Sequence, residues 1–140
     1  MNPNQLLRRR LDAYTLAEVL VVLCIIGILV FISLPNLLPV ITRAKTTEAK
    51  LQLKHLQMLE KNYYYEFSKY SDNLEELGFI QEKLTTDSKD GHANYRIEIT
   101  SSSPAGFTAK ATAVVDFNNN GKFNVWEIDQ DKNLKEVTPD

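Results

Sequence analysis

The segment LAEVLVVLCIIGILVFISL, from Leu16 to Leu34, decides the architecture of this chain of 140 residues. Nineteen helical residues at about 1.5 Å each reach roughly 28 Å, which is close to the hydrocarbon thickness of a bilayer. Between Tyr14 and Thr42, 21 of 29 residues are apolar and the only charged side chain is that of Glu18. The sequence therefore predicts a membrane-spanning helix that carries one carboxylate.

The remaining residues, from Arg43 to Asp140, are polar, with 29 charged side chains among 98 residues. The averages over the whole chain, 44% hydrophobic and 24% charged residues, hide this division. One cysteine, Cys24, and two histidines exclude an intrachain disulfide and a zinc site made of four His or Cys side chains. A net charge of -2 argues against nucleic acid as a partner, because phosphate binding needs a concentrated basic face.

Charge around the apolar segment indicates its orientation. Three arginines, Arg8 to Arg10, precede it, and the next basic residues after it are Arg43 and Lys45. The positive-inside rule therefore predicts a cytoplasmic N-terminus and an outward-facing head. No small-residue cleavage site follows the segment, so a secretory cut there is not expected, and an uncleaved signal anchor is the alternative.

Glu18 is the first candidate functional residue. A carboxylate inside a membrane span costs at least about 2.5–3.5 kcal/mol on insertion scales, and such residues are usually functional. On position alone, an interfacial Glu18 that simply reaches headgroups and water is an equal alternative.

The stretch AYTLAEVLVVLCIIGIL, from Ala13 to Leu29, with Pro35 beyond it, resembles the type III signal of type IV pilins and of the pseudopilins of type II secretion. That family has a short basic leader, a small residue before the cut, an aromatic residue after it, and a glutamate five residues into the mature chain. The likeness covers about residues 8–45. Ala13 stands where the family usually has Gly, Tyr14 where it usually has Phe, and Asp12 is unusual in the leader.

The resemblance implies how this end of the chain is processed. Prepilin peptidase is expected to remove the leader, residues 1–13, by cutting between Ala13 and Tyr14, and Tyr14 is expected to be N-methylated. Glu18 is then expected to pair with the new α-amine of a neighbouring subunit. Such a pair fixes register more than it adds stability.

The resemblance also implies that the stretch from Gly27 to Pro35 loosens when subunits stack. Both residues are expected to interrupt the helix, since proline removes one helical hydrogen bond, and kinks that a membrane helix simply tolerates are the alternative. Glu18, Gly27 and Pro35 are therefore the predicted assembly residues.

A second helical pattern runs from Arg43 to Phe67. Its apolar residues recur at three- and four-residue steps and predict a stripe that packs on a sheet: Ala49, Leu53, Leu56, Leu59, Tyr63 and Phe67. A second set, Leu51, Met58 and Tyr65, is either further core or faces a neighbouring subunit, and we favour core.

Alternation predicts four strands, over residues 95–100, 107–117, 123–128 and 134–137, with a tight Asn-Gly hairpin at 118–121. Residues 68–92 connect helix and sheet, with a short helix at 74–79, and resemble the αβ loop of simple pilins. The predicted fold is α+β: a long N-terminal helix, half membrane-spanning and half amphipathic, packed on a four-stranded antiparallel sheet. The predicted parts are the leader 1–13, a polymerisation helix 14–42 and a globular head 43–140.

Residues 116–127 match the calcium-loop pattern D-x-[DN]-x-[DN]-G-x5-E at every fixed position. The predicted ligands are Asp116, Asn118, Asn120, Lys122, Asn124 and Glu127, the lysine through its backbone carbonyl. The flanks read as strands rather than helices, and an Asn-Gly hairpin explains much of the pattern without a metal. Ca²⁺ is thus a possible cofactor, with the hairpin as the alternative.

These features favour a structural subunit of an extracellular or periplasmic type IV filament. The alternatives are a major pseudopilin that drives protein export and a single-span adhesin that never polymerises. No nucleophile–base pair or phosphate loop is visible, and His55 and His92 read as surface and turn residues, so an enzyme is not expected. The expected partners are other copies, prepilin peptidase, an inner-membrane assembly platform, minor pilins or pseudopilins, and the membrane, without nucleic acid.

Overall fold

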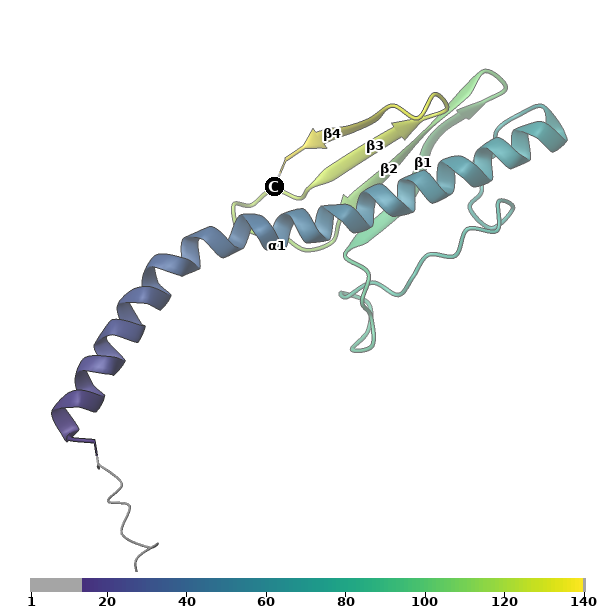
Figure 1. Ribbon diagram of the computed structural model, residues 1–140. Helices are drawn as coiled ribbons and strands as arrows, with labels where there is room; N and C mark the ends of the chain where they lie inside the picture. Colours follow the sequence, from purple (N-terminus) through teal and green to yellow (C-terminus); the bar gives the residue numbers. More distant parts are fainter. Residues whose placement is uncertain (1–13, 140) are drawn as a thin grey trace, which may run out of the picture. The chain divides into compact units, whose positions relative to one another are not determined.

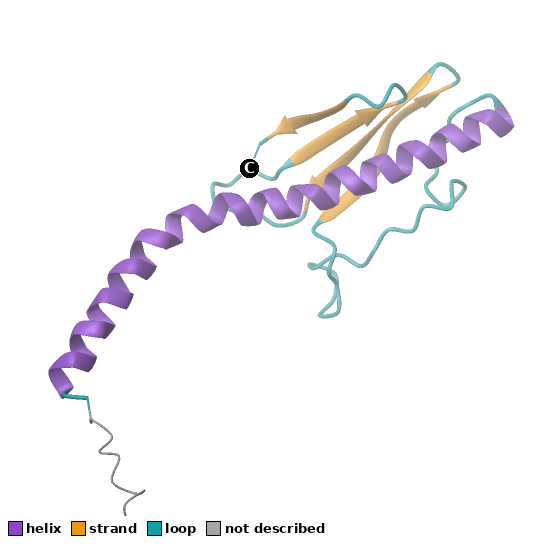
Figure 2. Cartoon of the chain, viewed as in Figure 1, coloured by secondary structure: helices purple, strands orange, loops and turns teal. Residues whose placement is uncertain are grey.

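The computed structural model describes residues 14–139, without the side chains of residues 36–38. One helix, α1 (Leu16–Phe67), precedes four strands: β1 (Tyr95–Ser103), β2 (Gly106–Ala113), β3 (Val125–Asp129) and β4 (Leu134–Thr138). The strands pair antiparallel in the order β1-β2-β3-β4, and the C-terminal half of α1 lies along this sheet (Figure 1, Figure 2). The predicted α+β, pilin-like fold is confirmed.

The helix α1 is unbroken in its secondary structure. It continues through Gly27, Pro35 and Pro39, so the expected interruption is wrong at this level. A proline lacks only its own N–H, so a helix can lose one hydrogen bond while the flanking turns keep theirs. Whether this stretch loosens on stacking stays a prediction.

A boundary between Leu37 and Leu38 separates two compact units, close to the predicted division after residue 42. We call residues 14–37 the N-terminal unit and residues 38–139 the head. Each is described by itself below.

The core of the head forms where α1 meets β2. Ala49, Leu53 and Leu56 of α1 are fully buried, as the stripe predicted. Alternate residues of β2 face the core, and three of them are alanines, whose small side chains let the helix approach the sheet closely. Larger side chains complete this core: Leu77, Phe79, Tyr95, Ile97, Phe107 and Ile128.

The rest of the helical pattern is only partly buried. Leu59 and Tyr63 pack against the core, but Phe67 is 51% exposed and contacts the Tyr63 ring, 4.5 Å between centroids. The preference for Leu51, Met58 and Tyr65 as core is wrong, because these side chains are 63%, 52% and 72% exposed. Residues seven apart drift by only about 20° around a helix, so the three form one ridge on the uncovered face.

The connections differ from the sequence expectation in two places. Residues 74–78 form a single turn rather than a helix, closed by Gly78 at a φ of +72°. The strand β2 ends at Ala113 instead of Phe117, and residues 114–124 form a wide loop rather than a tight hairpin. Asp116 stabilises this loop, since its carboxylate accepts the backbone N–H groups of Asn118, Asn120 and Gly121.

Candidate assembly site

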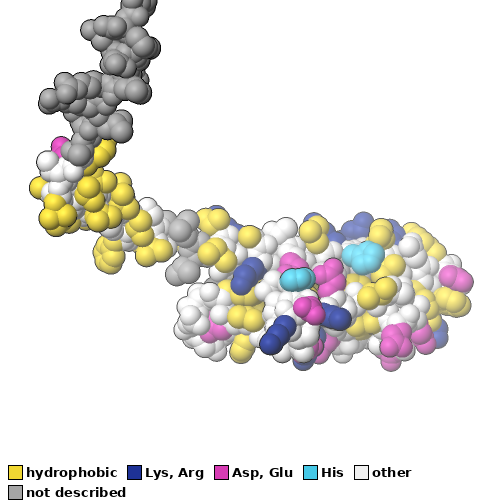
Figure 3. All heavy atoms as spheres, turned by 90° about the horizontal axis from the view of Figure 1, so that it is seen from below, with side chains coloured by type: hydrophobic (Ala, Val, Ile, Leu, Met, Phe, Trp, Pro, Cys, Tyr) yellow, Lys and Arg dark blue, Asp and Glu magenta, His cyan; other side chains and the backbone are white. Residues whose placement is uncertain are grey.

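The N-terminal unit exposes an apolar surface along its whole helix. Every Leu, Ile, Val and Phe side chain from Leu16 to Leu34 is between 46% and 85% exposed. An 18-residue window of α1 has a mean hydropathy of 2.9, long and apolar enough to cross a membrane, and yellow side chains dominate this unit in Figure 3. Apolar surface of this extent is covered by lipid or by protein in the functional state.

Glu18 closes the first turn of this helix. Its Oε2 accepts hydrogen bonds from the backbone N–H of Thr15 at 2.7 Å and from the Thr15 hydroxyl at 2.9 Å. The Glu18 N–H donates in return to the Thr15 hydroxyl oxygen at 3.3 Å. Thr15 and Glu18 thus form a capping box, which satisfies two backbone donors that would otherwise lack partners at the helix start.

The capping box leaves half of the carboxylate available. Among residues 14–139, none donates a hydrogen bond to Oε1 of Glu18. Tyr14, two residues before the start of α1 at Leu16, is 84% exposed. The arrangement can hold a cation at Oε1 without giving up the helix cap.

Sequence reasoning missed the role of Thr15. The signal was present, because Thr15-Leu16-Ala17-Glu18 is an S/T-x-x-E pattern just before an apolar run. Ala13 and the leader lie outside the described residues, so cleavage and methylation stay predictions. At Gly27, an added Cβ would meet nothing within 4 Å, so a single copy does not need glycine there.

The six predicted calcium ligands do not converge. Asp116, Asn118 and Asn120 share one loop, where their oxygens accept backbone N–H groups, including that of Lys122 at 2.7 Å. Asn124 is fully buried and bonds instead to the Tyr95 hydroxyl and to Glu136.

The last predicted ligand, Glu127, lies on β3. It pairs there with Lys135 at 3.0 Å and with Lys110 at 3.6 Å. In the described part of the chain, no three His, Cys, Asp or Glu side chains come together in a way that could hold a metal ion. Calcium binding therefore stays a prediction for the three loop residues alone.

Glu60 is a second group that the sequence did not single out. It is fully buried on α1, its Oε2 accepts the Ser71 N–H at 3.0 Å, and its Oε1 has no partner among residues 14–139. Burial raises the pKa of Glu60 to about 7. The Ser71 hydrogen bond works against this shift, and the charge of Asp72 adds to it.

Two comparisons with known proteins bear on the identity of the chain. No protein-family profile matches the chain. A curated relative, the type IV major pilin protein PilA of Myxococcus xanthus (strain DK1622), is 41% identical over 70 residues. That region is 50% of this chain and 32% of the relative, so the match spans about a third of the relative's length. This similarity and the long apolar helix confirm the resemblance to type IV pilins.

Proposed function

We propose that the chain is a structural subunit of a type IV filament, a pilus, and polymerises through its N-terminal helix. One observation carries the proposal: among residues 14–139, the apolar segment from Leu16 to Leu34 is exposed, and Glu18 near its start has one carboxylate oxygen that accepts no hydrogen bond. Lipid covers such a helix before assembly, and the helices of other copies cover it afterwards. The role is structural rather than catalytic.

We propose that Glu18 fixes the register between neighbouring subunits. Removal of residues 1–13 creates an α-ammonium at Tyr14, whose reference pKa is about 7.7–8.0, so it is largely protonated at neutral pH. In the filament, this ammonium of one copy pairs with the available Glu18 oxygen of another. A carboxylate that leaves the membrane surface for a packed core gains its partner only in the correct register.

The experiment separates the charge of Glu18 from its capping role. Glu18→Gln keeps an acceptor for the Thr15 N–H but removes the negative charge, whereas Glu18→Leu removes both. We expect both variants to insert into the membrane, and both to give few filaments when each is the sole subunit. Thr15→Val, which loses the hydroxyl but keeps the Glu18 charge, is the control and retains filaments.

The result can contradict the proposal in a specific way. Normal filament yield from Glu18→Gln would show that the charge is dispensable and that Glu18 serves the helix cap alone. Electron microscopy of sheared filaments and immunoblots of the membrane fraction give the two readouts.

The proposed life cycle adds three partners: prepilin peptidase, an inner-membrane assembly platform and minor subunits. The precursor then spans the inner membrane with a cytoplasmic N-terminus, and the mature chain enters a surface filament. Mass spectrometry tests the processing, since the mature chain should begin at an N-methylated Tyr14. A gene deletion that abolished protein secretion but left surface filaments intact would favour the pseudopilin role instead.

A further inference from the structure

From Arg43 to Asn62 the exposed charged side chains of α1 are all basic, and the exposed acid Glu66 follows in the last turn of the helix. Between Arg43 and Asn62 the helix has two acids, and both turn inward. Glu48 accepts the Asn94 N–H at 2.7 Å, and Glu60 is fully buried against Ser71. Three basic side chains of the same stretch are exposed: Arg43, Lys54 and Lys61.

Two of these lysines border a groove. Lys54 and Lys61, with Lys132 from the turn between β3 and β4, surround an open hollow of about 430 Å³ whose apolar lining comes from Met58 and Ile128. Gln57 and Asn62 complete the lining, and no acid contributes to it. We call this hollow the basic groove. Its chemistry suits an apolar side chain flanked by carboxylates.

A segment with that chemistry lies elsewhere on the same head. From Asp72 to Glu82 the chain has four acids and no base. Asp72, Glu75 and Glu82 are exposed, and Ile80 between them is 84% exposed, more than any other large apolar side chain of the head. We call Ile80 and these three acids the acidic knob.

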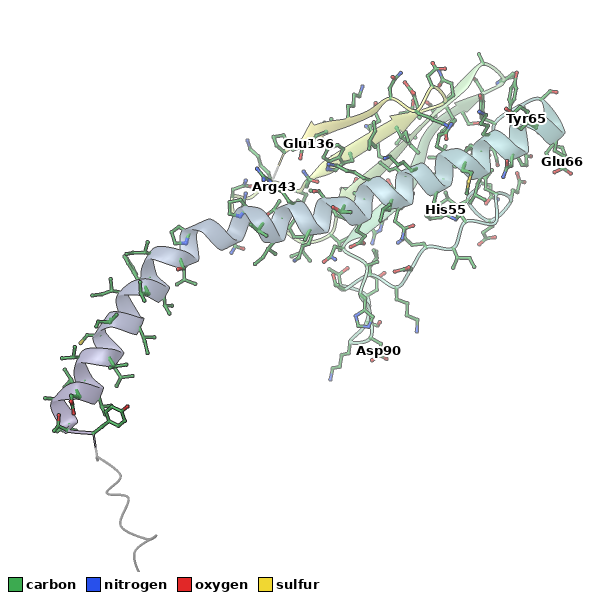
Figure 4. The ribbon with its side chains drawn as sticks, in the orientation of Figure 1. Arg43, His55, Tyr65, Glu66, Asp90 and Glu136 are labelled. Atoms are coloured by element: carbon green, nitrogen blue, oxygen red, sulfur yellow. The ribbon has the colours of Figure 1, made fainter. Side chains whose placement is uncertain are left out.

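The knob and the groove lie on opposite flanks of one ridge. The ridge is Leu51, Met58 and Tyr65, and Figure 4 labels Tyr65 near the end of α1. On one flank, Ile80 and Glu82 line a shallow hollow with Leu51, Gln52 and His55. Lys54 and Lys61 stand three positions after Leu51 and Met58, about 60° around the helix on the other flank. Within one chain, the ridge therefore separates the knob from the groove.

We propose that the acidic knob of one copy docks into the basic groove of the next. This inference rests on the proposed filament, because it names a second copy as the partner. The two surfaces differ and are complementary, so each copy offers one of each, and such head-to-tail contacts build rings or open filaments rather than two-fold pairs. In this contact Ile80 of one copy is buried against Met58 of the next. The opposite charges fix the register, because a shifted arrangement would leave them unpaired.

Cross-linking in assembled cells tests the contact directly. In a Cys24→Ala parent, the pair Ile80→Cys and Lys61→Cys is treated with a short bis-maleimide, and denatured subunits are resolved by size. We expect a ladder of multimers, because each copy joins two neighbours. The matched control pairs Ile80→Cys with Lys135→Cys, an exposed position on β4, and should give no ladder. If filaments form and both cysteine pairs give a ladder, or neither does, the proposed interface is overturned.

Charge reversal keeps the inference testable if the cysteine variants fail to assemble. Lys61→Glu or Glu82→Lys alone should lower filament yield about tenfold, since each places like charges together. The double variant should restore the yield, and a double variant no better than either single one overturns the interface. Filament counts of the native chain separate the two ideas. If the native chain forms no filaments, the filament proposal is overturned as well. If the native chain forms filaments but the double variant does not restore the yield, only the interface is overturned.

Discussion

The two halves of α1 have the same secondary structure and opposite surfaces. From Leu16 to Leu34 every large apolar side chain is uncovered, whereas from Arg43 to Phe67 the helix buries one stripe and exposes charge on the other side. A helix that is apolar on all sides must be surrounded by lipid or by other helices. A helix with one apolar stripe at a 3.6-residue period packs on a single layer of structure through that stripe. A continuous helix can therefore contain two units whose stability comes from different sources.

The largest expected effect tests that difference in stability. Leu53→Ala removes a fully buried side chain and should lower the free energy of unfolding of the head by about 2–5 kcal/mol. Leu23→Ala, at a position 63% exposed, should change it by less than about 0.5 kcal/mol. The measurement is urea unfolding of the full chain in detergent, followed by fluorescence of Trp126, which lies in the head and is the only tryptophan. Equal effects of the two substitutions would show that the units unfold as one.

A smaller effect on the free energy of unfolding is expected from Glu60, which is buried in the head. The pKa of Glu60 is raised from an ordinary value of 4.5 to about 7, so the folded head binds this proton more tightly than the unfolded chain does. The stabilisation is therefore complete below pH 4.5 and is lost as pH rises through 7. Glu60→Gln should remove this slope and leave the variant about 1–2 kcal/mol more stable than the native chain at pH 8.

The control for this prediction is Glu75→Gln, an exposed carboxylate of the same connecting segment. Its unfolding curve should follow that of the native chain at every pH from 5 to 8. A native chain whose stability does not fall over that range would contradict the role of Glu60. Trp126 fluorescence again gives the readout.

Much of the fold follows from the sequence because its signals are periodic. The apolar run before Pro35, the helical stripe through Leu53 and Leu56, and the alternation along β2 each specify an element and the face it buries. The exposed ridge was misjudged for a physical reason. Leu51, Met58 and Tyr65 are as apolar as core residues, and periodicity locates a stripe without saying whether another layer covers it.

The site was only half predictable. Glu18 stands out because a charge inside an apolar run is rare, but its partner Thr15 is an ordinary residue whose role depends on where the helix begins. Glu60 and Asn124 could not be found from spacing, because their burial comes from the packing of distant segments, Ser71 and Tyr95. Spacing also could not show that the fold turns Asn124 and Glu127, two of the six residues of the calcium pattern, toward other partners.

The smallest expected effect concerns calcium at the loop of the head. The oxygens of Asp116 accept backbone N–H groups, which outweigh the opposing effect of burial and keep the pKa of Asp116 below its ordinary value. A cation would have to displace some of these donors, and the side-chain oxygens that share the loop come from Asp116, Asn118 and Asn120, with a single formal charge among them, so the affinity should be weak, with a Kd near about 1 mM. At about 5 mM Ca²⁺ the head should then gain about 1 kcal/mol of stability. Asp116→Asn should abolish this gain, and Asp129→Asn, at the end of β3, should not. Unfolding curves that do not shift with Ca²⁺ would leave the loop as a turn held by its own side chains, and the head as a unit stabilised by packing alone.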